Sequence, residues 1–368
     1  MNQFGARRER LRATLVERDL DLFLATAETT CFYFTGAVAS RPGGFLLSAG
    51  TGSALLLVKG IEEPQVQETS SVDVRSTGVL GGNTIKELAS AVQSLAGGSP
   101  RIGFEEDAVS FETYSAWRAA LPDVKLVPAT RLINRLRAVK DRGEIEDIRA
   151  ACQVSDLAMS AAVDAIKRGE PEHAAAAAAE SVMRKHVMSF GFEPLIGSGR
   201  RSGLFRRYPG DVKPGPQDIV RLDMGARRSY ATGYGYHSDM CRCLTPAVPE
   251  DRALTQLQLN LAVQQSTIAA VKPGKSIAEV SREGLRPVHG TPYEHATTMD
   301  GHGVGLDLHE WPPFNEFTNE LLVPGMVLAI EPMLTIPAVQ TTCFEDVVLV
   351  TETGSERLTR LPGALWTL

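Results

Sequence analysis

The sequence predicts an α/β domain that ends near residue 132, followed by a larger domain, so that the chain as a whole belongs to the α+β class. Two observations predict this division. Before residue 132, short apolar runs alternate with segments of helical spacing, as in an α/β domain. After residue 142, long helical segments separate strand-like runs that carry single carboxylates. A chain of 368 residues can form two or three such packed units.

The N-terminal elements follow from the spacing of apolar residues. Helical spacing predicts helices over residues 6–19, 84–96 and 110–120. Apolar runs predict strands over residues 20–26, 44–47, 53–58 and 101–104. No glycine-rich phosphate-binding loop joins a predicted strand to a predicted helix, so the pattern does not favour nucleotide binding.

The larger domain is predicted to contain four helices, over residues 143–168, 171–186, 253–271 and 276–283. Glu144 and Glu146 stand at the start of the first helix and Pro171 begins the second, as helix N-termini favour. The segments 163–169 and 268–274 both end a helix with a basic residue and a glycine. This similarity would be expected if the domain consists of two related halves. It would also be expected by chance, because helix C-termini often carry a basic residue and a glycine.

Composition excludes several classes of function. The net charge of −6 gives no basic field for a nucleic-acid backbone. There is no run of eighteen apolar residues, and no apolar segment follows the charged N-terminal residues, so a soluble cytoplasmic protein without a membrane partner is expected. Five scattered cysteines do not suggest a disulfide framework. Cys241 and Cys243 have no second pair to complete a metal site and are interpreted as buried strand residues.

Four predicted strands each carry a carboxylate among apolar residues. The strands cover residues 219–225, 234–243, 327–332 and 343–350, and the acids are Asp223, Asp239, Glu331 and Glu345. Any single acid could face solvent from an edge strand. A buried carboxylate is costly unless it is paired or bound to a metal, and solvent exposure of all four is improbable.

A glycine-rich stretch from Gly301 to Glu310 adds two histidines, His302 and His309. In isolation it is equally well interpreted as a turn. Together, four carboxylates and one imidazole suit Mn²⁺, Co²⁺, Fe²⁺ or Zn²⁺. Two such ions, about 3.5–4 Å apart, would lower the pKa of a shared water and stabilise a tetrahedral oxyanion.

Five ordered motifs carry a family resemblance. They are Asp223-Met224-Gly225, Tyr236-His237-Ser238-Asp239 followed by Arg242, Gly301-His302-Gly303-Val304-Gly305 ending in His309-Glu310, Pro324-Gly325-Met326 leading to Glu331-Pro332, and Phe344-Glu345-Asp346. Residues 135–368 resemble the metallopeptidase family M24 of aminopeptidase P, prolidase, methionine aminopeptidase and creatinase, which has the pita-bread fold with pseudo-twofold halves. Residues 1–132 resemble the smaller α/β N-terminal domain of its Xaa-Pro peptidase branch.

The resemblance implies roles for individual residues. The metal ligands for two divalent ions, Mn²⁺ foremost, would be Asp223, Asp239, His302, Glu331 and Glu345, with Asp239 and Glu345 bridging. His309 would hydrogen-bond the substrate carbonyl and the tetrahedral intermediate, or else only position a ligand. Glu331 could also take a proton from the attacking water, although a metal-bound hydroxide can suffice. A homodimer is expected from the resemblance alone.

The chain departs from the family pattern at positions that concern the substrate. Arg206 and Thr298 stand where the Xaa-Pro branch usually has histidines, Cys343 stands where it usually has an arginine, and the connection from Asp223 to Asp239 is longer than usual. The substrate-binding candidates are Arg206, Tyr236, His295 and Thr298. The basic cluster of Arg200, Arg201, Arg206 and Arg207 could bind a substrate carboxylate, or it could simply face water.

Three functional hypotheses follow. The first is a dinuclear metallohydrolase that cleaves an amide bond of a dipeptide or short peptide, of the Xaa-Pro type, by attack of a metal-bound hydroxide. The second keeps the metal site but takes a small non-peptide C–N compound as substrate. The third is a binding protein with a vestigial metal site, and the complete set of five ligands counts against it.

Overall fold

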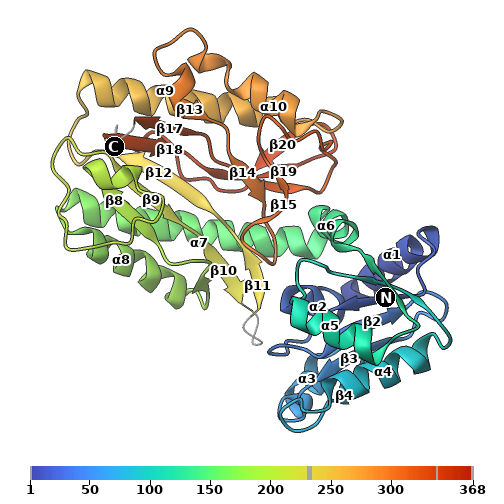
Figure 1. Cartoon of the computed structure of the whole chain (residues 1–368). Helices are drawn as coiled ribbons and strands as arrows, with labels where there is room; N and C mark the ends of the chain where they lie inside the picture. The colour runs from blue at the N-terminus through green and yellow to red at the C-terminus, as the bar shows by residue number, and fades with distance from the viewer. Residues whose placement is uncertain (1, 230–233, 337–338, 366–368) are drawn as a thin grey trace. The chain divides into compact units, whose positions relative to one another are not determined.

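The computed structural model describes residues 2–229, 234–336 and 339–365 of the chain (Figure 1). These residues form two compact units: one extends to Arg137, and the other begins at Ala138. Tyr234 groups with the first unit. No described helix is both long and apolar enough to cross a membrane.

The first unit is built on a mixed six-stranded sheet with the order β4-β3-β2-β1-β5-β6. β1 pairs antiparallel with β2 and parallel with β5, and β3–β4 and β5–β6 are also parallel. The strands are β1 Leu22–Ala25, β2 Gly44–Ser48, β3 Ala54–Val58, β4 Asp73–Ser76, β5 Arg101–Phe104 and β6 Lys125–Pro128. The helices are α1 Gln3–Glu17, α2 Glu28–Thr35, α3 Glu63–Thr69, α4 Thr84–Leu95, α5 Phe111–Ala120 and α6 Thr130–Ala138.

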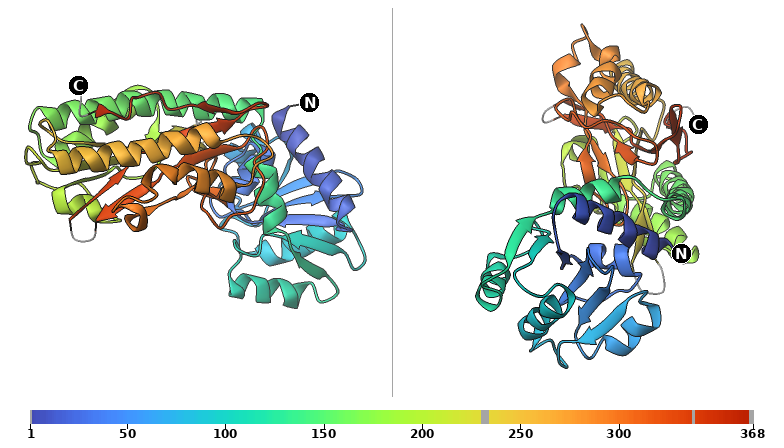
Figure 2. Two further views of the ribbon diagram at one scale, coloured as in Figure 1. Left: turned by 90° about the horizontal axis from the view of Figure 1, so that it is seen from above. Right: turned by 90° about the vertical axis from the view of Figure 1, so that its right-hand side faces the viewer.

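Helices cover both faces of this sheet because successive side chains of a strand point to opposite faces (Figure 2). Leu22 and Leu24 of β1 pack with apolar residues of α4 and α5, including Trp117. Phe23, between them, packs edge-to-face against Phe34 of α2. The α/β character predicted for this part of the chain is therefore confirmed, although α2, α3, α6, β4 and β6 were not predicted.

The second unit contains two halves, each with a pair of helices packed on strands (Figure 1). One core joins α7 and α8 to β8, β9 and β12, and another joins α9 and α10 to β16 and β19. The helices are α7 Arg142–Lys167, α8 Glu172–Lys185, α9 Asp251–Ala270 and α10 Ile277–Gly284, with short 3₁₀ turns η1 Gly199–Gly203, η2 Arg286–Val288 and η3 Glu294–Ala296. All four predicted helices are confirmed to within two residues.

Four small sheets complete the second unit, with the orders β12-β9-β8, β11-β10-β7, β13-β17-β18 and β15-β14-β16-β19-β20. In the first half the strands are β7 Ser189–Phe190, β8 Leu195–Ser198, β9 Val220–Met224, β10 Ala226–Ser229, β11 Gly235–His237 and β12 Met240–Leu244. In the second half they are β13 Thr297–Thr298, β14 Gly301–Gly303, β15 Glu310–Pro313, β16 Val327–Ile330, β17 Met333–Ile336, β18 Gln340–Cys343, β19 Asp346–Val350 and β20 Ser355–Arg357.

Two segments that were predicted as continuous strands are interrupted in the structure, so these predictions are wrong in that respect. The predicted strand 234–243 is divided into β11 and β12, with Ser238 and Asp239 between them. The hydroxyl of Ser238 donates to the Ala226 carbonyl, and Gly225 allows the close approach, since a Cβ there would lie 1.8 Å from the Ser238 carbonyl oxygen. The predicted strand 343–350 is likewise interrupted between β18 and β19.

Candidate metal centre

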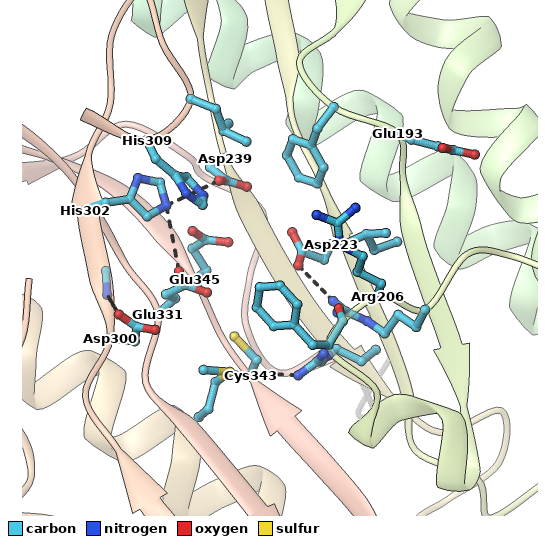
Figure 3. Close-up of a pocket in the computed structure, with 18 of the residues that line it drawn as sticks. Glu193, Arg206, Asp223, Asp239, Asp300, His302, His309, Glu331, Cys343 and Glu345 are labelled. Atoms are coloured by element: carbon cyan, nitrogen blue, oxygen red, sulfur yellow. Dashed lines mark hydrogen bonds and ion pairs between the residues drawn. The ribbon is translucent and has the colours of Figure 1, made fainter. Parts of the chain in front are cut away.

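Five residues from separate segments converge on one cavity of about 400 Å³ in the second unit (Figure 3). Asp223 lies on β9 and His302 on β14, whereas the other three flank strands. Asp239 precedes β12, Glu331 follows β16 and Glu345 precedes β19. The structure therefore brings together all five residues that the sequence marked as metal ligands.

Backbone contacts hold the residues that flank strands. The amide of Glu331 donates to the Asp300 carbonyl and the amide of Glu345 to the Cys241 carbonyl, both at 3.0 Å. The fully buried guanidinium of Arg242 donates to the Glu345 carbonyl at 2.6 Å and pairs with Asp346 at 2.6 Å. Glu345 is thus fixed by its backbone, and its carboxylate is left for the cavity.

Several polar atoms of this cluster lack the partners that buried groups require. Among the described residues, Asp239 Oδ1, Glu345 Oε1 and His302 Nε2 are buried and accept or donate no hydrogen bond. His302 Nε2 lies 3.6 Å from Asp239 Oδ2 and 3.7 Å from Glu331 Oε1. Such atoms are costly unless something occupies the space between them.

The ligand atoms lie close enough to share cations. One atom each from His302, Glu331 and Glu345 lie within 4.8 Å of one another, and so do one atom each from Asp223, Asp239 and Glu345. Two overlapping groups that share Glu345 match the geometry of a two-ion site, and the oxygen and imidazole donors suit borderline divalent ions. The residues present therefore fit a dinuclear metal centre.

Burial and mutual repulsion shift the pKa values in the cluster. Burial, with the charge of Cys241 next, raises the pKa of Asp223 to about 6, against the opposing effect of Arg207. Burial and the neighbouring carboxylates raise the pKa values of Asp239, Glu331 and Glu345 well above the usual range. Burial lowers the pKa of His302 to about 4, so its imidazole is neutral near pH 7, as a metal ligand must be.

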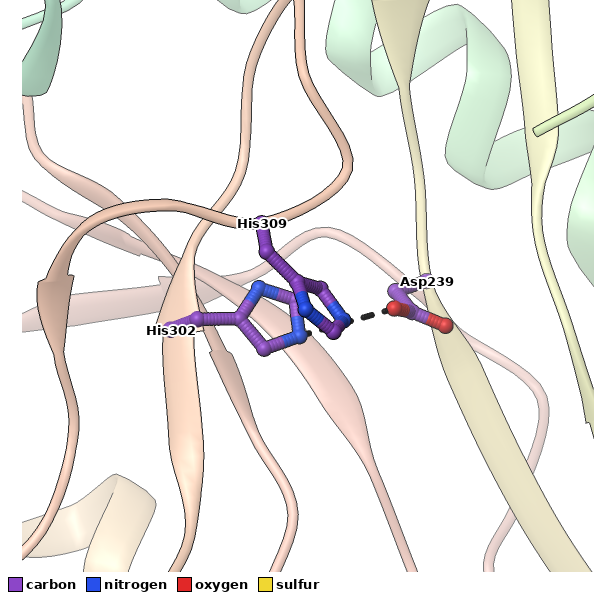
Figure 4. Close-up of side chains that lie close together, drawn as sticks. All are labelled: Asp239, His302 and His309. Atoms are coloured by element: carbon purple, nitrogen blue, oxygen red, sulfur yellow. Dashed lines mark ion pairs between the residues drawn. The ribbon is translucent and has the colours of Figure 1, made fainter. Parts of the chain in front are cut away.

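His309 lies at the open side of the cluster (Figure 4). Its ring centroid is 3.9 Å from that of His302, with the rings tilted by 44°. It forms a group with Asp239 and His302 whose atoms also lie within 4.8 Å of one another. Burial lowers the pKa of His309, so it too is neutral near pH 7. This position allows contact with a substrate in the cavity, and it also allows contact with an ion.

The basic cluster predicted from sequence divides in the structure. Arg207 is buried and forms a 2.8 Å ion pair with Asp223. Arg206 lines the cavity, and the partner it has among the described residues is the Tyr208 hydroxyl at 3.4 Å. Arg201 pairs with the buried Glu172 at 3.2 Å, away from this cavity. Arg200 is likewise not among the described residues that line the cavity.

The other substrate-binding candidates lie elsewhere. Tyr236 is buried, and its hydroxyl donates to Glu144 at 2.9 Å. His295 and Thr298 are exposed on η3 and β13. These three residues are not among the described residues that line the cavity, and their substrate roles stay predictions.

Sequence reasoning missed two charged groups of the site. Arg221 is buried and lines the cavity. Its place two residues before Asp223 on one strand was a usable signal, because such residues share a face. Lys140 forms a buried 3.0 Å ion pair with Glu310, next to His309 in the chain. No local pattern predicts that pair, since 170 residues separate its members.

Residues 146–352 match metallopeptidase family M24, and residues 7–139 match the creatinase/prolidase N-terminal domain. The chain therefore belongs to family M24, with a creatinase-type α/β domain followed by a pita-bread domain. This confirms the family and the fold that the motifs indicated. The family is one of dinuclear metallopeptidases, and the candidate ligand groups described above are present in this chain.

Individual relatives cover nearly the whole chain. It is 30% identical over 364 residues to the uncharacterized peptidase YqhT of Bacillus subtilis (strain 168), across 97% of this chain and 98% of that protein. It is 28% identical to the Xaa-Pro dipeptidase of Pyrococcus furiosus, across 96% and 97% of the two chains. The crystal structure of the prolidase from Pyrococcus horikoshii OT3 has a TM-score of 0.87 at 25% identity, covering 98% of this chain and 99% of its own. The Xaa-Pro dipeptidase from Bacillus anthracis has a TM-score of 0.88 at 27% identity, covering 99% of both.

Proposed function

We propose that this protein is a dinuclear metal-dependent peptidase that cleaves the amide bond of Xaa-Pro dipeptides. One observation carries the proposal: four carboxylates and an imidazole from five segments meet at one cavity, with buried polar atoms that have no protein partner among the described residues. The likeness to Xaa-Pro dipeptidases over nearly the full chain supports the substrate class. A vestigial site would not be expected to retain five costly buried polar side chains.

The residues proposed to hold two divalent ions, Mn²⁺ foremost, are Asp223, Asp239, His302, Glu331 and Glu345. Two divalent ions held there would polarise the scissile carbonyl and lower the pKa of a water at the site. The chain itself supplies the acceptors and their orientation. Arg242 and the backbone contacts of Glu331 and Glu345 fix the backbone that carries these two carboxylates before any ion binds.

His309 is proposed to hydrogen-bond the substrate carbonyl as negative charge develops on its oxygen. Its lowered pKa keeps the imidazole neutral near pH 7, and a neutral imidazole can still donate one N–H. Glu331 is proposed to receive a proton from the attacking water. In the metal-free protein, burial together with the Asp223 and Asp300 charges raises the pKa of Glu331. Its carboxylate is a group that can accept a proton in general base catalysis.

Arg206 is proposed to bind the free carboxylate of a dipeptide substrate. Among the guanidinium groups that line the cavity, Arg207 is committed to Asp223 and Arg221 to the Leu204 carbonyl, whereas Arg206 contacts only the Tyr208 hydroxyl among the described residues. An exposed guanidinium at a cavity wall can form two parallel hydrogen bonds with a carboxylate. A dipeptide would be preferred over a longer peptide for this reason.

The test begins with metal-stripped protein. Metal content after Mn²⁺ loading is measured together with hydrolysis of Xaa-Pro dipeptides, longer Xaa-Pro peptides and small non-peptide amides, with His302→Ala as the metal-binding control. We expect loaded protein to hydrolyse the dipeptides and His302→Ala to bind little metal. Absence of metal binding would refute the proposed function, and bound metal with turnover of small amides alone would redirect it to the non-peptide substrates.

The role of Arg206 has its own control. Arg206→Ala is compared with Arg200→Ala, because Arg200 belongs to the same basic cluster but does not line this cavity. With Xaa-Pro as substrate, Arg206→Ala should raise KM while Arg200→Ala leaves it unchanged. With the corresponding Xaa-Pro amide, which has no carboxylate, the two variants should behave alike. Equal KM values for Arg206→Ala and wild type on the free dipeptide would exclude this role.

A further inference from the structure

Arg207 makes direct contact with a proposed metal ligand. Its Nη2 donates to Asp223 Oδ2 at 2.8 Å, and its Nη1 donates to the Phe205 carbonyl at 3.2 Å. The side chain is 2% exposed. Gly197 on β8 makes room for it, because a Cβ at that position would lie 3.0 Å from Arg207 Cβ. The guanidinium is therefore packed into the fold.

The four carboxylates of the proposed metal site differ in whether a basic side chain contacts them. Among the described residues, Arg207 is the one arginine or lysine within 4.0 Å of any of them. Asp239 and Glu345 instead keep buried oxygens that have no partner. The ligand group of Asp223, Asp239 and Glu345 is thus already in contact with a guanidinium, whereas the group of His302, Glu331 and Glu345 is not.

A fixed guanidinium on a ligand can act in two opposite ways. As an orienting partner, it would hold the carboxylate in place and strengthen metal binding. As a competitor, it occupies one oxygen of Asp223 and repels a second cation at short range in a poorly solvated site. Burial favours competition, because the Arg207 guanidinium cannot move into water without breaking its hydrogen bonds to the Phe205 carbonyl and to Asp223.

We propose that Arg207 is a built-in cation that weakens metal binding at the position containing Asp223, relative to the position formed by His302, Glu331 and Glu345. This inference rests on the proposed dinuclear site. Arg207 acts here as a positioning residue, since it meets the ion through Asp223.

The chain offers a matched control in Arg221. Arg221 is also buried and lines the same cavity. Its Nη2 donates to the Leu204 carbonyl at 2.9 Å, and it forms no ion pair with the four carboxylates among the described residues. Arg221→Met therefore removes a nearby positive charge without removing a contact on Asp223. Arg207→Lys keeps the charge and serves as the conservative variant.

The test is calorimetric titration of the metal-free full chain with Mn²⁺, which reads binding independently of turnover. Wild type should show a tight and a weak class of site. Arg207→Met should lower the Kd of the weak class by about tenfold or more, a size typical of changes beside a metal ligand, and leave the tight class nearly unchanged. Arg221→Met should cause a smaller shift, and Arg207→Lys should retain the weak class.

Each other outcome counts against the proposal. A higher weak-class Kd in Arg207→Met would show that Arg207 orients Asp223, and an unchanged one would show that Arg207 does not affect metal binding. A shift equalled by Arg221→Met would show a general effect of charge. If Arg207→Met does not fold, as judged by its melting curve, Arg207→Gln is titrated by the same criteria. Wild type that binds no Mn²⁺ would refute the proposed function as well, whereas two equal sites in wild type would refute the role of Arg207 alone.

Discussion

Asn in place of Asp223 should remove a defined part of the pH dependence of folding. Burial and the Cys241 charge raise the pKa of Asp223 from 3.8 to about 6 in the folded, metal-free protein. Between these two pH values the folded state keeps a proton that the unfolded state releases. The free energy of unfolding therefore falls as the pH rises through this window.

The size of the effect follows from the shift. A difference of roughly two pKa units corresponds to about 3 kcal/mol, which is present below pH 4 and lost above pH 6. His302 acts in the opposite direction, because its pKa falls to about 4 and its contribution to stability is lost as the pH falls toward 4. Wild type minus Asp223→Asn cancels the His302 contribution, which is present in both proteins. The difference still includes the effect of the Asp223 charge on the pKa values of Asp239, Glu331 and Glu345, which acts in the same direction.

The assay is guanidinium unfolding of chelator-treated protein at pH 4, 5, 6 and 7. Fluorescence is followed in a Trp117→Phe background, in which Trp311 of the second unit is the tryptophan among the described residues. The difference in unfolding free energy between wild type and Asp223→Asn should decrease by about 3 kcal/mol from pH 4 to pH 7. A difference that stays constant or increases with pH would refute the reasoning. Saturating Mn²⁺ should stabilise wild type more at pH 7 than at pH 5, because binding displaces protons.

Four further variants test other parts of the site. His302→Ala should lose metal, whereas His309→Ala should keep metal content and lose more than about tenfold in kcat; unchanged turnover would contradict its assigned role. Lys140→Met leaves Glu310 buried without its cation and should cost about 3–5 kcal/mol of unfolding free energy, with Lys140→Arg as the milder control. Gly225→Ala places a methyl group 1.8 Å from a carbonyl oxygen, so little folded protein is expected on gel filtration, and a normal melting temperature would refute that packing argument.

Local periodicity was sufficient for the elements that bury one continuous face. The spacing of apolar residues placed α7 within one residue at each end and β5 at its observed bounds. The same logic located the four carboxylate candidates, because a charged residue inside an apolar strand is visible in the sequence. His302 came instead from the glycine-rich stretch and the family motif. Burial of one regular face gives an element its apolar spacing, and a charged residue that interrupts this spacing is therefore visible in the sequence.

Long-range contacts had no such signal. The break at Asp239 depends on a hydroxyl contact from Ser238 to Ala226, which alternation of residue types cannot reveal. The sequence alone does not decide whether Arg207 belongs to a substrate-binding cluster or to one that faces water. Its partner Asp223 comes next to it only when β9 has folded. Of the four substrate candidates, Arg206 lines the cavity, whereas Tyr236, His295 and Thr298 are not among the described residues that line it. A family position gives a place in the sequence, and the local backbone then decides which way the side chain points.

The interruptions of the strands explain how this chain can gather four carboxylates at one point. Within a continuous strand, neighbouring side chains alternate between faces. Asp239, Glu331 and Glu345 instead stand where strands start or stop, so their side chains are released from that alternation.

Leaving a strand usually leaves a backbone amide unpaired, which is costly when buried. Here the amides of Glu331 and Glu345 still donate to the carbonyls of Asp300 and Cys241. The backbone is thus satisfied while the side-chain atoms are not. The unfavourable free energy of burial is therefore concentrated in the ligand side chains, where a bound cation would offset it. Among the four carboxylates, Arg207 offsets part of it at Asp223 alone. Metal binding should therefore stabilise the second unit more than any single contact within it does.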